Sequence, residues 1–539
     1  MRKKLAAISI ILVALILSSC NPIIKNNADI VRTTDNALDI TIEIPSTEAD
    51  RIVVSSAMLN SMDIPVYSEK KEYKDYNGGD LTYNVGYYGK HEVAIELYKG
   101  KSLIDTIIRD YIVTSDNYNI ALLSATLPVT YTSLMLADEG NTTNPINATY
   151  PTIITLERSD AYNWNALLPN MTDCPFIDGY KTGNNGDHWK EFIEAYKTYV
   201  EYLHGLNSSS KFHFIFNDFD SALIPLIALD AGLSPNEFSV VLISDGSGTY
   251  SVFSSTFGKG GENDNSINSF NKMTELWNTV KYKAMAGDGT FVSDLQKAAD
   301  SISPWLSRYL TPYAPILIND SDLDIKWVVS RNGSEVFGSS EVYTAKVQSN
   351  SNIVAINMNT QLLEKLSDKE KKQFANLYNL SLEVFDEADK EGKQIMIFLG
   401  TKDDQKLHLD EFFSFFTNYY GTEDYAFFYK GHPGELTSNN AERAEIIKKH
   451  GWQELDAQIP AELFYFFRPD CLMGGFESST FDAGMNISFL VYDEENTTPP
   501  TYLSRAEGYI ERNPQGYHVV KNDGSECYWD PSNPSVFDF

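Results

Sequence analysis

Three short motifs combine residue types that could carry out acid–base chemistry next to a phosphate group. The first is Ser244-Asp245-Gly246, which directly follows the apolar run 238–243. A carboxylate at the carboxyl end of a buried strand points into a cleft and could take a proton from a hydroxyl group. The glycine lets the backbone approach a ligand closely. Taken alone, Asp-Gly-Ser-Gly is more often a turn, so Asp245 is a candidate base only together with other motifs.

The second motif is Lys430-Gly431-His432-Pro433, which follows the aromatic run 425–429. An imidazole could protonate or hydrogen-bond a departing phosphate, and Pro433 would stiffen the turn that presents it. The alternative is a His-Pro turn with a purely structural role.

The third motif is Gly474-Gly475 followed by Ser478-Ser479. A glycine turn that leads into a helix, with hydroxyl groups at its start, predicts an anion site built from amide donors and the helix dipole. The alternative is a serine that caps the helix.

The elements around these motifs alternate between buried strands and amphipathic helices, which predicts parallel sheets covered by helices. We expect a first Rossmann-like domain at 150–390 and a second at 391–505, with 506–539 returning to the first. Two consecutive units of this kind favour a GT-B-like arrangement with a ligand between the carboxyl ends of the sheets. The expected strands are 152–156, 212–216, 238–243, 395–399, 425–429, 471–473 and 487–492; the expected helices are 187–203, 221–229, 410–416 and 440–449.

The N-terminal part has a different pattern. Residues 1–20 combine a basic start with a short apolar run that ends at Cys20, which is typical of a lipoprotein signal peptide. Cys20 would become the lipidated first residue, and the following Asn21 favours the outer membrane within the cell envelope. We expect a polar tether at 21–37. Short alternating strands then predict an all-β immunoglobulin-like sandwich at 38–145.

The net charge and the cysteine spacing restrict which ligands and partners the protein can bind. The formal net charge of the 539 residues is −31, and such a field repels nucleic acid. The remaining cysteines have no short spacing, which argues against a zinc site. A disulfide between two of them stays open, and the sequence does not indicate an oligomeric state.

In order and spacing, the three motifs resemble those of bacterial sialyltransferases of the marine-bacterial and pasteurellal type, over residues 150–539. Members of this family carry an Asp-Asp-Gly-Ser segment, Lys-Gly-His-Pro and Ala-Ser-Ser, and several marine members are lipoproteins with an immunoglobulin-like N-terminal domain. The resemblance implies transfer of sialic acid from CMP-sialic acid to a glycan hydroxyl with inversion, without a cofactor or metal ion. It implies that Asp245 is the general base and that His432 assists the departing CMP. The donor nucleotide would be held by Lys430, Gly431, Pro433, Glu462, Ser478 and Ser479.

The sequence also departs from the family pattern. Ser244 stands where the family usually has an aspartate, and Asp220 aligns with a family histidine near the acceptor. The tryptophan expected after Gly400-Thr401 is missing. These positions, together with Asn217, belong to the sialic-acid and acceptor side. The acceptor glycan, the linkage (α2,3, α2,6 or α2,8) and the identity of the donor sugar therefore stay open.

Two other functions compete with this one. Asp218-Phe219-Asp220 is similar to the DxD motif of metal-dependent glycosyltransferases, in which two carboxylates hold a divalent ion against a nucleotide diphosphate. A non-catalytic, glycan-binding surface lipoprotein is the other alternative. Retention of both Asp245 and His432 argues against it, because binding alone requires neither a base nor an acid.

Overall fold

The computed structural model describes residues 31–33, 38–45, 47–123, 126–141, 144–156, 162–177, 187–219, 221–258, 266–291, 293–294, 313–401, 407–432, 441–476, 478–483, 485, 487–497 and 517–529. The predicted signal peptide, with Cys20, lies outside these residues. Within the described part of the chain, no helix has both the length and the apolar character that a membrane crossing requires.

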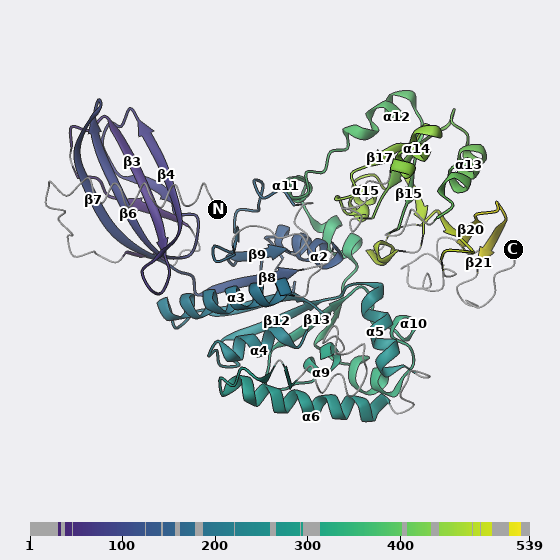
Figure 1. Ribbon diagram of the computed structural model, residues 1–539, viewed down its shortest axis with the longest axis horizontal. Coiled ribbons are helices and arrows are strands. Elements are labelled where there is room, and N and C mark those ends of the chain that lie inside the picture. Colours follow the sequence, from purple (N-terminus) through teal and green to yellow (C-terminus); the bar gives the residue numbers. More distant parts are fainter. Residues whose placement is uncertain are drawn as a thin grey trace.

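The chain begins with a unit of antiparallel sheets, drawn in purple at the left of Figure 1. Its larger sheet has the strand order β1-β7-β6-β3-β4, and β2 pairs with β5 in a smaller one. Ile40 and Ile42 of β2 share one hydrophobic cluster with Ile52 and Val54 of β3, so the two sheets enclose a common core. The strands are β1 Val31–Thr33, β2 Asp39–Ile42, β3 Arg51–Leu59, β4 Pro65–Lys74, β5 Leu81–Asn84, β6 Gly89–Lys99 and β7 Ser102–Val113.

The structure shifts two boundaries expected for this unit. β1 lies inside the predicted tether and pairs in parallel with β7. The unit also ends earlier than residue 145, because β8 (Asn117–Leu123) pairs in parallel with β9 and β11 of the next sheet. An apolar strand that follows directly on a run of β-strands carries no local signal that it belongs to another sheet.

The first α/β unit is built on a sheet with the order β10-β9-β8-β11-β12-β13-β14, and all of its described strands run parallel. Successive side chains of β11 and β12 enter different clusters on the two faces of the sheet, as expected for a sheet covered on both sides. Besides β8, its strands are β9 Thr152–Leu156, β10 Met171–Asp173, β11 Lys211–Asn217, β12 Phe238–Ile243, β13 Ile325–Val329 and β14 Ile353–Ala355. Its α-helices are α2 Thr126–Ala137, α3 Asp187–Leu206, α4 Leu223–Asp230, α5 Ser247–Phe257, α6 Ser266–Met285, α9 Ala314–Leu317 and α10 Ser334–Phe337.

Helix α2 lies between the two α/β units, near the middle of Figure 1. Every side chain from Leu127 to Ala137 is buried. One face packs on the first sheet, and the same hydrophobic cluster continues into the second sheet through Ile397 and Phe428. Pro128 fits the first turn of the helix, where its missing N–H costs nothing. A single hydrophobic cluster therefore joins the two units.

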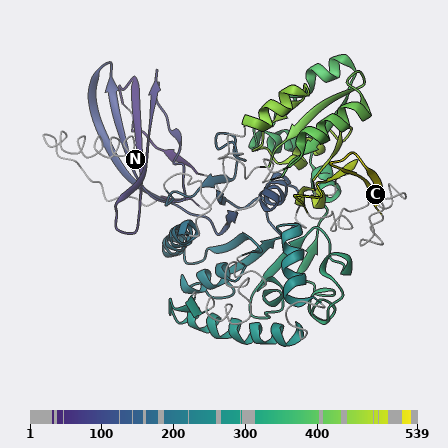
Figure 2. The ribbon, with the colours of Figure 1, turned by 45° about the vertical axis from the view of Figure 1, so that its right-hand side comes forward.

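The second α/β unit lies above the first in both Figure 1 and Figure 2. Its sheet has the order β17-β16-β15-β18-β19-β20-β21. Within the first unit, η2 Tyr343–Val347 precedes β14. The segments that connect the units are η3 Met358–Leu362, η4 Leu363–Lys365, α11 Asp368–Leu377, η5 Glu383–Phe385 and α12 Asp386–Glu391. The unit itself contains β15 Gln394–Leu399, α13 Leu409–Tyr420, β16 Tyr425–Lys430, α14 Ala441–Lys449, β17 Gln453–Leu455, α15 Ala461–Phe467, β18 Leu472–Gly475, η8 Ser479–Ala483, β19 Phe489–Tyr492, β20 Tyr517–Lys521 and β21 Glu526–Trp529.

The described part of the C-terminal segment stays with this second sheet, and the expected return to the first unit is wrong for it. β20 pairs in parallel with β19, and β21 pairs antiparallel with β20. Val519 and Val520 are both fully buried, so the strand is held by apolar side chains on its two faces.

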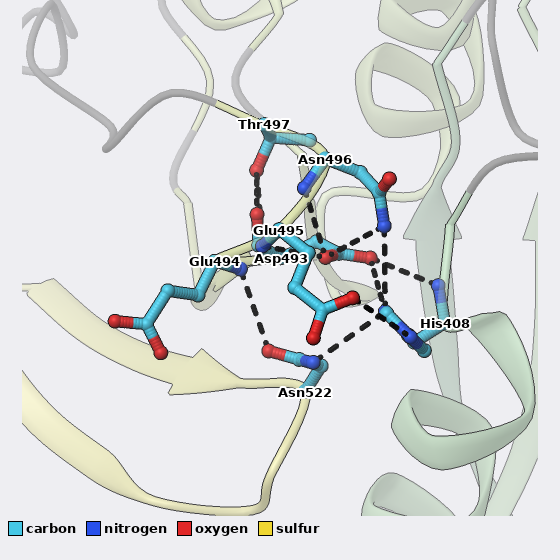
Figure 3. A network of polar contacts seen from close by, with 7 residues as sticks. All are labelled: His408, Asp493, Glu494, Glu495, Asn496, Thr497 and Asn522. Carbon is cyan, nitrogen blue, oxygen red and sulfur yellow. Dashed lines mark hydrogen bonds and ion pairs between the residues drawn. The ribbon is translucent and has the colours of Figure 1, made fainter.

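A polar network ties these last strands to the start of α13 (Figure 3). His408 contacts Asp493, which follows β19, at 2.9 Å from Nδ1 to Oδ2. Asn522, in the turn between β20 and β21, lies 3.4 Å from the same ring nitrogen. The hydrogen bond with Asp493 raises the pKa of His408, since the carboxylate stabilises the imidazolium.

Candidate active site

A hollow at the carboxyl edge of the second sheet gathers most of the predicted nucleotide-binding residues. It contains about 500 Å³ of empty space, part of it continuous with solvent. Thr126 and Leu127 bring the N-terminal end of α2 to the same hollow, so both α/β units contribute to it. The N-terminal end of a helix favours an anionic ligand. The predicted residues among its lining are Lys430, Gly431, His432, Glu462 and Ser478.

Strand β16 delivers Lys430 to this edge as its last residue, and His432 follows two positions later. The Lys430 side chain is buried, and its Nζ donates to the carbonyl oxygens of Gly431 at 2.6 Å and Ala457 at 3.0 Å. This ammonium group ties the residue that follows β16 to the segment that follows β17. It also supplies positive charge close to Glu462, since it acts to lower the pKa of that carboxyl group.

Glu462 lies in the first turn of α15 and is buried. Thr480 Oγ1 donates to its Oε2 at 3.4 Å, and Thr130 Oγ1 of helix α2 lies 3.2 Å from its Oε1. Burial raises the pKa of Glu462 above its usual value. The carboxyl group therefore connects the first unit, the second unit and the wall of the hollow.

Gly474 and Gly475 lie within β18, and the glycine turn expected there is wrong. A Cβ atom on Gly474 would stand 2.1 Å from the carbonyl oxygen of Phe489, and one on Gly475 would stand 2.3 Å from that of Leu399. The close approach of both neighbouring strands explains the glycine pair. The expected helix is also replaced by the short 3₁₀ segment η8, in which Thr480 N–H donates to Ser478 Oγ at 3.3 Å.

Hydrogen bonds to Asp218 and Thr249 fix the loop that carries Asp245. Asp245 N–H donates to Thr249 Oγ1 at 2.8 Å and to Asp218 Oδ1 at 3.3 Å. The Thr249 hydroxyl and the Trp327 indole donate to Asp218 Oδ2 at 2.7 Å and 2.9 Å. Burial raises the pKa of Asp218 to about 6. Both carboxylate oxygens of Asp218 thus already accept protein hydrogen bonds.

Gly246 and Gly248 of this loop are explained by a positive φ angle and by close packing, respectively. Gly246 has φ = 67°, in the region that favours glycine, and its N–H donates to Ser244 Oγ at 3.0 Å. A Cβ on Gly248 would stand 2.7 Å from the Phe219 ring and 3.0 Å from the Asp245 carboxylate. The Asp-Gly-Ser-Gly sequence is therefore required by the turn that presents Asp245.

The described residues that line the hollow around His432 do not include Asp245. Two segments nevertheless connect the two sites. Helix α5 starts two residues after Asp245 and contacts η8, which starts immediately after Ser478. Helix α5, which follows the Asp245 loop of the first unit, therefore lies next to η8 in the second unit.

The remaining predicted site residues are not among the described residues that line the hollow around His432. Asn217 ends β11 and is buried, and Ser244 is buried with its hydroxyl donating to Thr249 Oγ1 at 3.0 Å. Asp220, Pro433 and the side chain of Ser479 lie outside the described residues. Thr249, Trp327 and the start of α2 were not predicted. Thr249 could have been noticed as a hydroxyl four residues after Asp245, whereas nothing in the sequence indicates Trp327.

The sequence matches no protein-family model and no curated protein. Solved structures do match. The α/β-galactoside α-2,3-sialyltransferase from the luminous marine bacterium Photobacterium phosphoreum has a TM-score of 0.50 at 14% identity, over 76% of this chain and 99% of that one. A sialyltransferase from Photobacterium damsela has a TM-score of 0.49 at 13% identity, covering 92% and 99%. A Photobacterium sp. JT-ISH-224 2,6-sialyltransferase, solved with CMP and lactose, has a TM-score of 0.46 at 14% identity, covering 92% and 97%.

The match to the Photobacterium phosphoreum enzyme shows the fold. The chain is similar to a bacterial sialyltransferase in its two α/β units, which confirms at the level of fold the resemblance predicted from the motifs.

Proposed function

We propose that this protein is a glycosyltransferase that transfers sialic acid from CMP-sialic acid to a hydroxyl group of a glycan, with inversion. One observation carries the proposal. Lys430 and His432 at the end of β16, Glu462 of α15 and Ser478 before η8 line one hollow, in a chain whose fold is similar to that of a sialyltransferase.

In the proposed reaction, the acceptor oxygen attacks the anomeric carbon of sialic acid while the bond from that carbon to the CMP phosphate oxygen breaks. Asp245 takes the proton of the acceptor hydroxyl. CMP leaves with the bonding electron pair, and His432 donates a hydrogen bond or a proton to its phosphate. Lys430 and Glu462 hold the nucleoside, and Ser478 and Ser479 bind the phosphate. This scheme needs no metal ion.

The arrangement of Asp218 counts against the DxD alternative. Its carboxylate is buried and accepts hydrogen bonds from Thr249, Trp327 and the backbone of Asp245. A metal ligand would have to give up these bonds. Transfer that requires manganese and is lost in the Asp218→Asn variant would restore that alternative.

The test is to measure CMP release and product formation from CMP-sialic acid and lactose, with and without EDTA. We expect EDTA to have little effect. Asp245→Ala should abolish transfer but largely preserve CMP binding, because the base acts on the acceptor. His432→Ala should lower kcat by about 10²- to 10⁴-fold, the usual contribution of acid–base catalysis.

The exposed Asp424→Ala variant serves as the control and should keep its activity. Near-normal turnover in His432→Ala, or loss of CMP binding in Asp245→Ala, would contradict the assigned roles. Absence of both transfer and hydrolysis of CMP-sialic acid would favour the non-catalytic, glycan-binding alternative.

We further propose an immunoglobulin-like N-terminal unit. In a variable-type immunoglobulin sandwich, strands G, F, C and C′ lie side by side in one sheet, and B and E lie in the other. The order β7-β6-β3-β4 corresponds to the first set and the pair β2-β5 to the second. This correspondence supports the proposal.

We also propose lipidation of Cys20 and attachment to the cell envelope. The basic residues before the apolar run and the Ser18-Ser19-Cys20 sequence support it. Cells that produce the chain should incorporate labelled palmitate into it, and Cys20→Ser should remove the label. A labelled Cys20→Ser variant would refute the anchor.

A further inference from the structure

A second hollow opens at the amino ends of the strands of the first sheet. It contains about 620 Å³ of empty space, part of it open to solvent. Lys430 and His432 lie at carboxyl ends of strands in the other sheet, so this hollow is separate from the proposed donor site. The side chains that matter for the argument are Asn119, Tyr150, His213, Ser239, Asp324 and Lys326.

The strand register lines up the polar side chains of this hollow in one row. Asn119 lies opposite His213, and His213 lies opposite Ser239. Val240 pairs with Ile325, which places Asp324 beside Ser239 at the end of the row. Register partners of a parallel sheet point to the same face, so the side chains of the row lie next to one another.

Further along the strands, the same face becomes apolar. The side chains two residues after Asn119, His213 and Ser239 are Ala121, Ile215 and Val241, and all three belong to the cluster that α2 covers. A sheet face covered by helices is ordinarily apolar along its whole length. The change from polar to apolar side chains therefore falls inside the hollow, whose lining also includes Ile215 and Val241.

The hydrogen bonds of His213 indicate a neutral ring. Its Nε2 lies 3.1 Å from Asn117 Oδ1 and its Nδ1 lies 2.8 Å from Ser239 Oγ. Because the amide oxygen only accepts, Nε2 carries a proton, and in the neutral ring Nδ1 then accepts from the serine hydroxyl. Burial lowers the pKa of His213, which favours the same neutral form. The Tyr150 ring stacks on the imidazole at 5.1 Å between centroids.

Asn119 provides a buried acceptor without a donor. Its Nδ2 donates to the carbonyl oxygen of Asn147 at 2.8 Å and to Thr152 Oγ1 at 3.1 Å. No described residue donates to its Oδ1, although the residue is only 1% exposed. An unpaired buried acceptor costs about 1–3 kcal/mol. A hydroxyl group bound in the hollow would remove that cost.

We propose that this hollow is a second carbohydrate-binding site that takes a neutral, hydroxyl-rich sugar. Asn119 would accept from a sugar hydroxyl, Asp324 and Lys326 offer an acceptor and a donor at the rim, and Tyr150 presents an apolar ring to the C–H groups of a pyranose. An anion would meet Asp324 and the net charge of −31, and a cation would meet Lys326. An apolar ligand would leave the polar row unpaired.

The proposal is tested by binding alone, in the absence of donor, so that it stands or falls independently of transferase activity. The full chain is titrated with lactose, cellobiose and maltose in calorimetry, with glucose 6-phosphate as the anionic comparison. We expect at least one neutral disaccharide to bind. Tyr150→Ala and Asp324→Ala should each weaken that binding about tenfold, since each removes one contact of roughly 1.4 kcal/mol.

The control is Tyr282→Ala, which removes an exposed tyrosine from α6 and should bind like the unaltered chain. Thermal unfolding of each variant shows whether it is folded, and Lys326→Ala replaces any variant that is not. The proposal is overturned if no neutral disaccharide binds at about 10 mM. It is equally overturned if the variants of the hollow bind as well as Tyr282→Ala.

Discussion

The hydroxyl group of Thr130 lies between the carbonyl oxygen of Thr126 and the carboxyl group of Glu462. Its position bears on whether Glu462 is protonated. The hydroxyl oxygen is 3.0 Å from the carbonyl oxygen of Thr126 and 3.2 Å from Glu462 Oε1. A hydroxyl group has one proton to donate, so Thr130 either shares it between the two oxygens or accepts a hydrogen bond from a protonated, neutral Glu462. The raised pKa that burial gives Glu462 favours this neutral form.

This leads to a pH dependence of nucleoside binding. If Glu462 holds the ribose hydroxyl groups as a carboxylate, binding must release its proton. Cytidine affinity should therefore rise with pH, by at most tenfold per pH unit, until Glu462 is ionised in the free protein, and then level off. Cytidine is the suitable probe because it has no phosphate. Its Kd is measured by calorimetry from about pH 5 to about pH 8, where a carboxyl group of raised pKa titrates.

Glu462→Gln provides the control, because the amide has no proton to release. Its cytidine affinity should be weaker and independent of pH. The same rise in Glu462→Gln as in the unaltered chain would assign the pH dependence to another group. An affinity that falls with rising pH would contradict the binding role of the carboxylate.

At the scale of residues, the sequence could predict a shared position only for side chains that are neighbours in the chain. Lys430, Gly431 and His432 are contiguous, and the structure places them together in the hollow. The support of the Asp245 loop could not be predicted in the same way. Asp218, Thr249 and Trp327 meet only because β11, β12 and β13 end side by side.

At the scale of elements, β18 has the tightest steric requirement of the described strands near the hollow. We expect Gly475→Ala to destabilise the protein by about 1–3 kcal/mol or more, the cost of overpacking. The added Cβ would meet backbone atoms of Leu399 that cannot move aside, and φ = 145° at this position is unfavourable for alanine. The measurement is the free energy of unfolding in urea, together with CMP affinity.

Gly392→Ala is the matched control. Gly392 ends α12 with φ = 69°, and a Cβ at this position would have no atom within 4 Å. The variant should lose only the conformational advantage of glycine, about 1 kcal/mol, and leave CMP affinity unchanged. Equal losses in the two variants would show that the contact with Leu399 does not matter.

The elements that were predicted correctly have strong local patterns. β11, β12, β15 and β16 are apolar or aromatic runs of strand length, and they form where the sequence indicates. Helix α2 was missed for a physical reason. Because it is buried on every side, it lacks the alternation of polar and apolar faces by which a helix is recognised in a sequence.

At the scale of the whole molecule, tyrosines of α3 hold the antiparallel unit against the first α/β unit. Tyr202 Oη donates to the carbonyl oxygen of Leu59 and accepts from Lys90 N–H, both at 2.6 Å. Tyr199 Oη donates to the carbonyl oxygen of Tyr88 at 2.8 Å. These are backbone groups at the ends of β3 and β6, so the docking is specific.

We expect Tyr202→Phe to lower the free energy of unfolding by about 1–3 kcal/mol, because two buried backbone groups lose their partner. The proposed transferase activity should be unchanged, since Tyr202 does not line the hollow around His432. Tyr282→Phe, at an exposed position, is the control. Unfolding midpoints that are identical for the two variants would show that the Tyr202 hydrogen bonds do not stabilise the docking.

The position of α2 limits how this protein can be divided into fragments that fold on their own. A chain cut near residue 391 would leave the first fragment with one side of α2 facing water, and the second fragment without the surface that covers Ile397 and Phe428. Neither piece would be a self-sufficient module. Chimeras that exchange the second α/β unit with that of another protein would therefore also have to supply a matching surface for this helix.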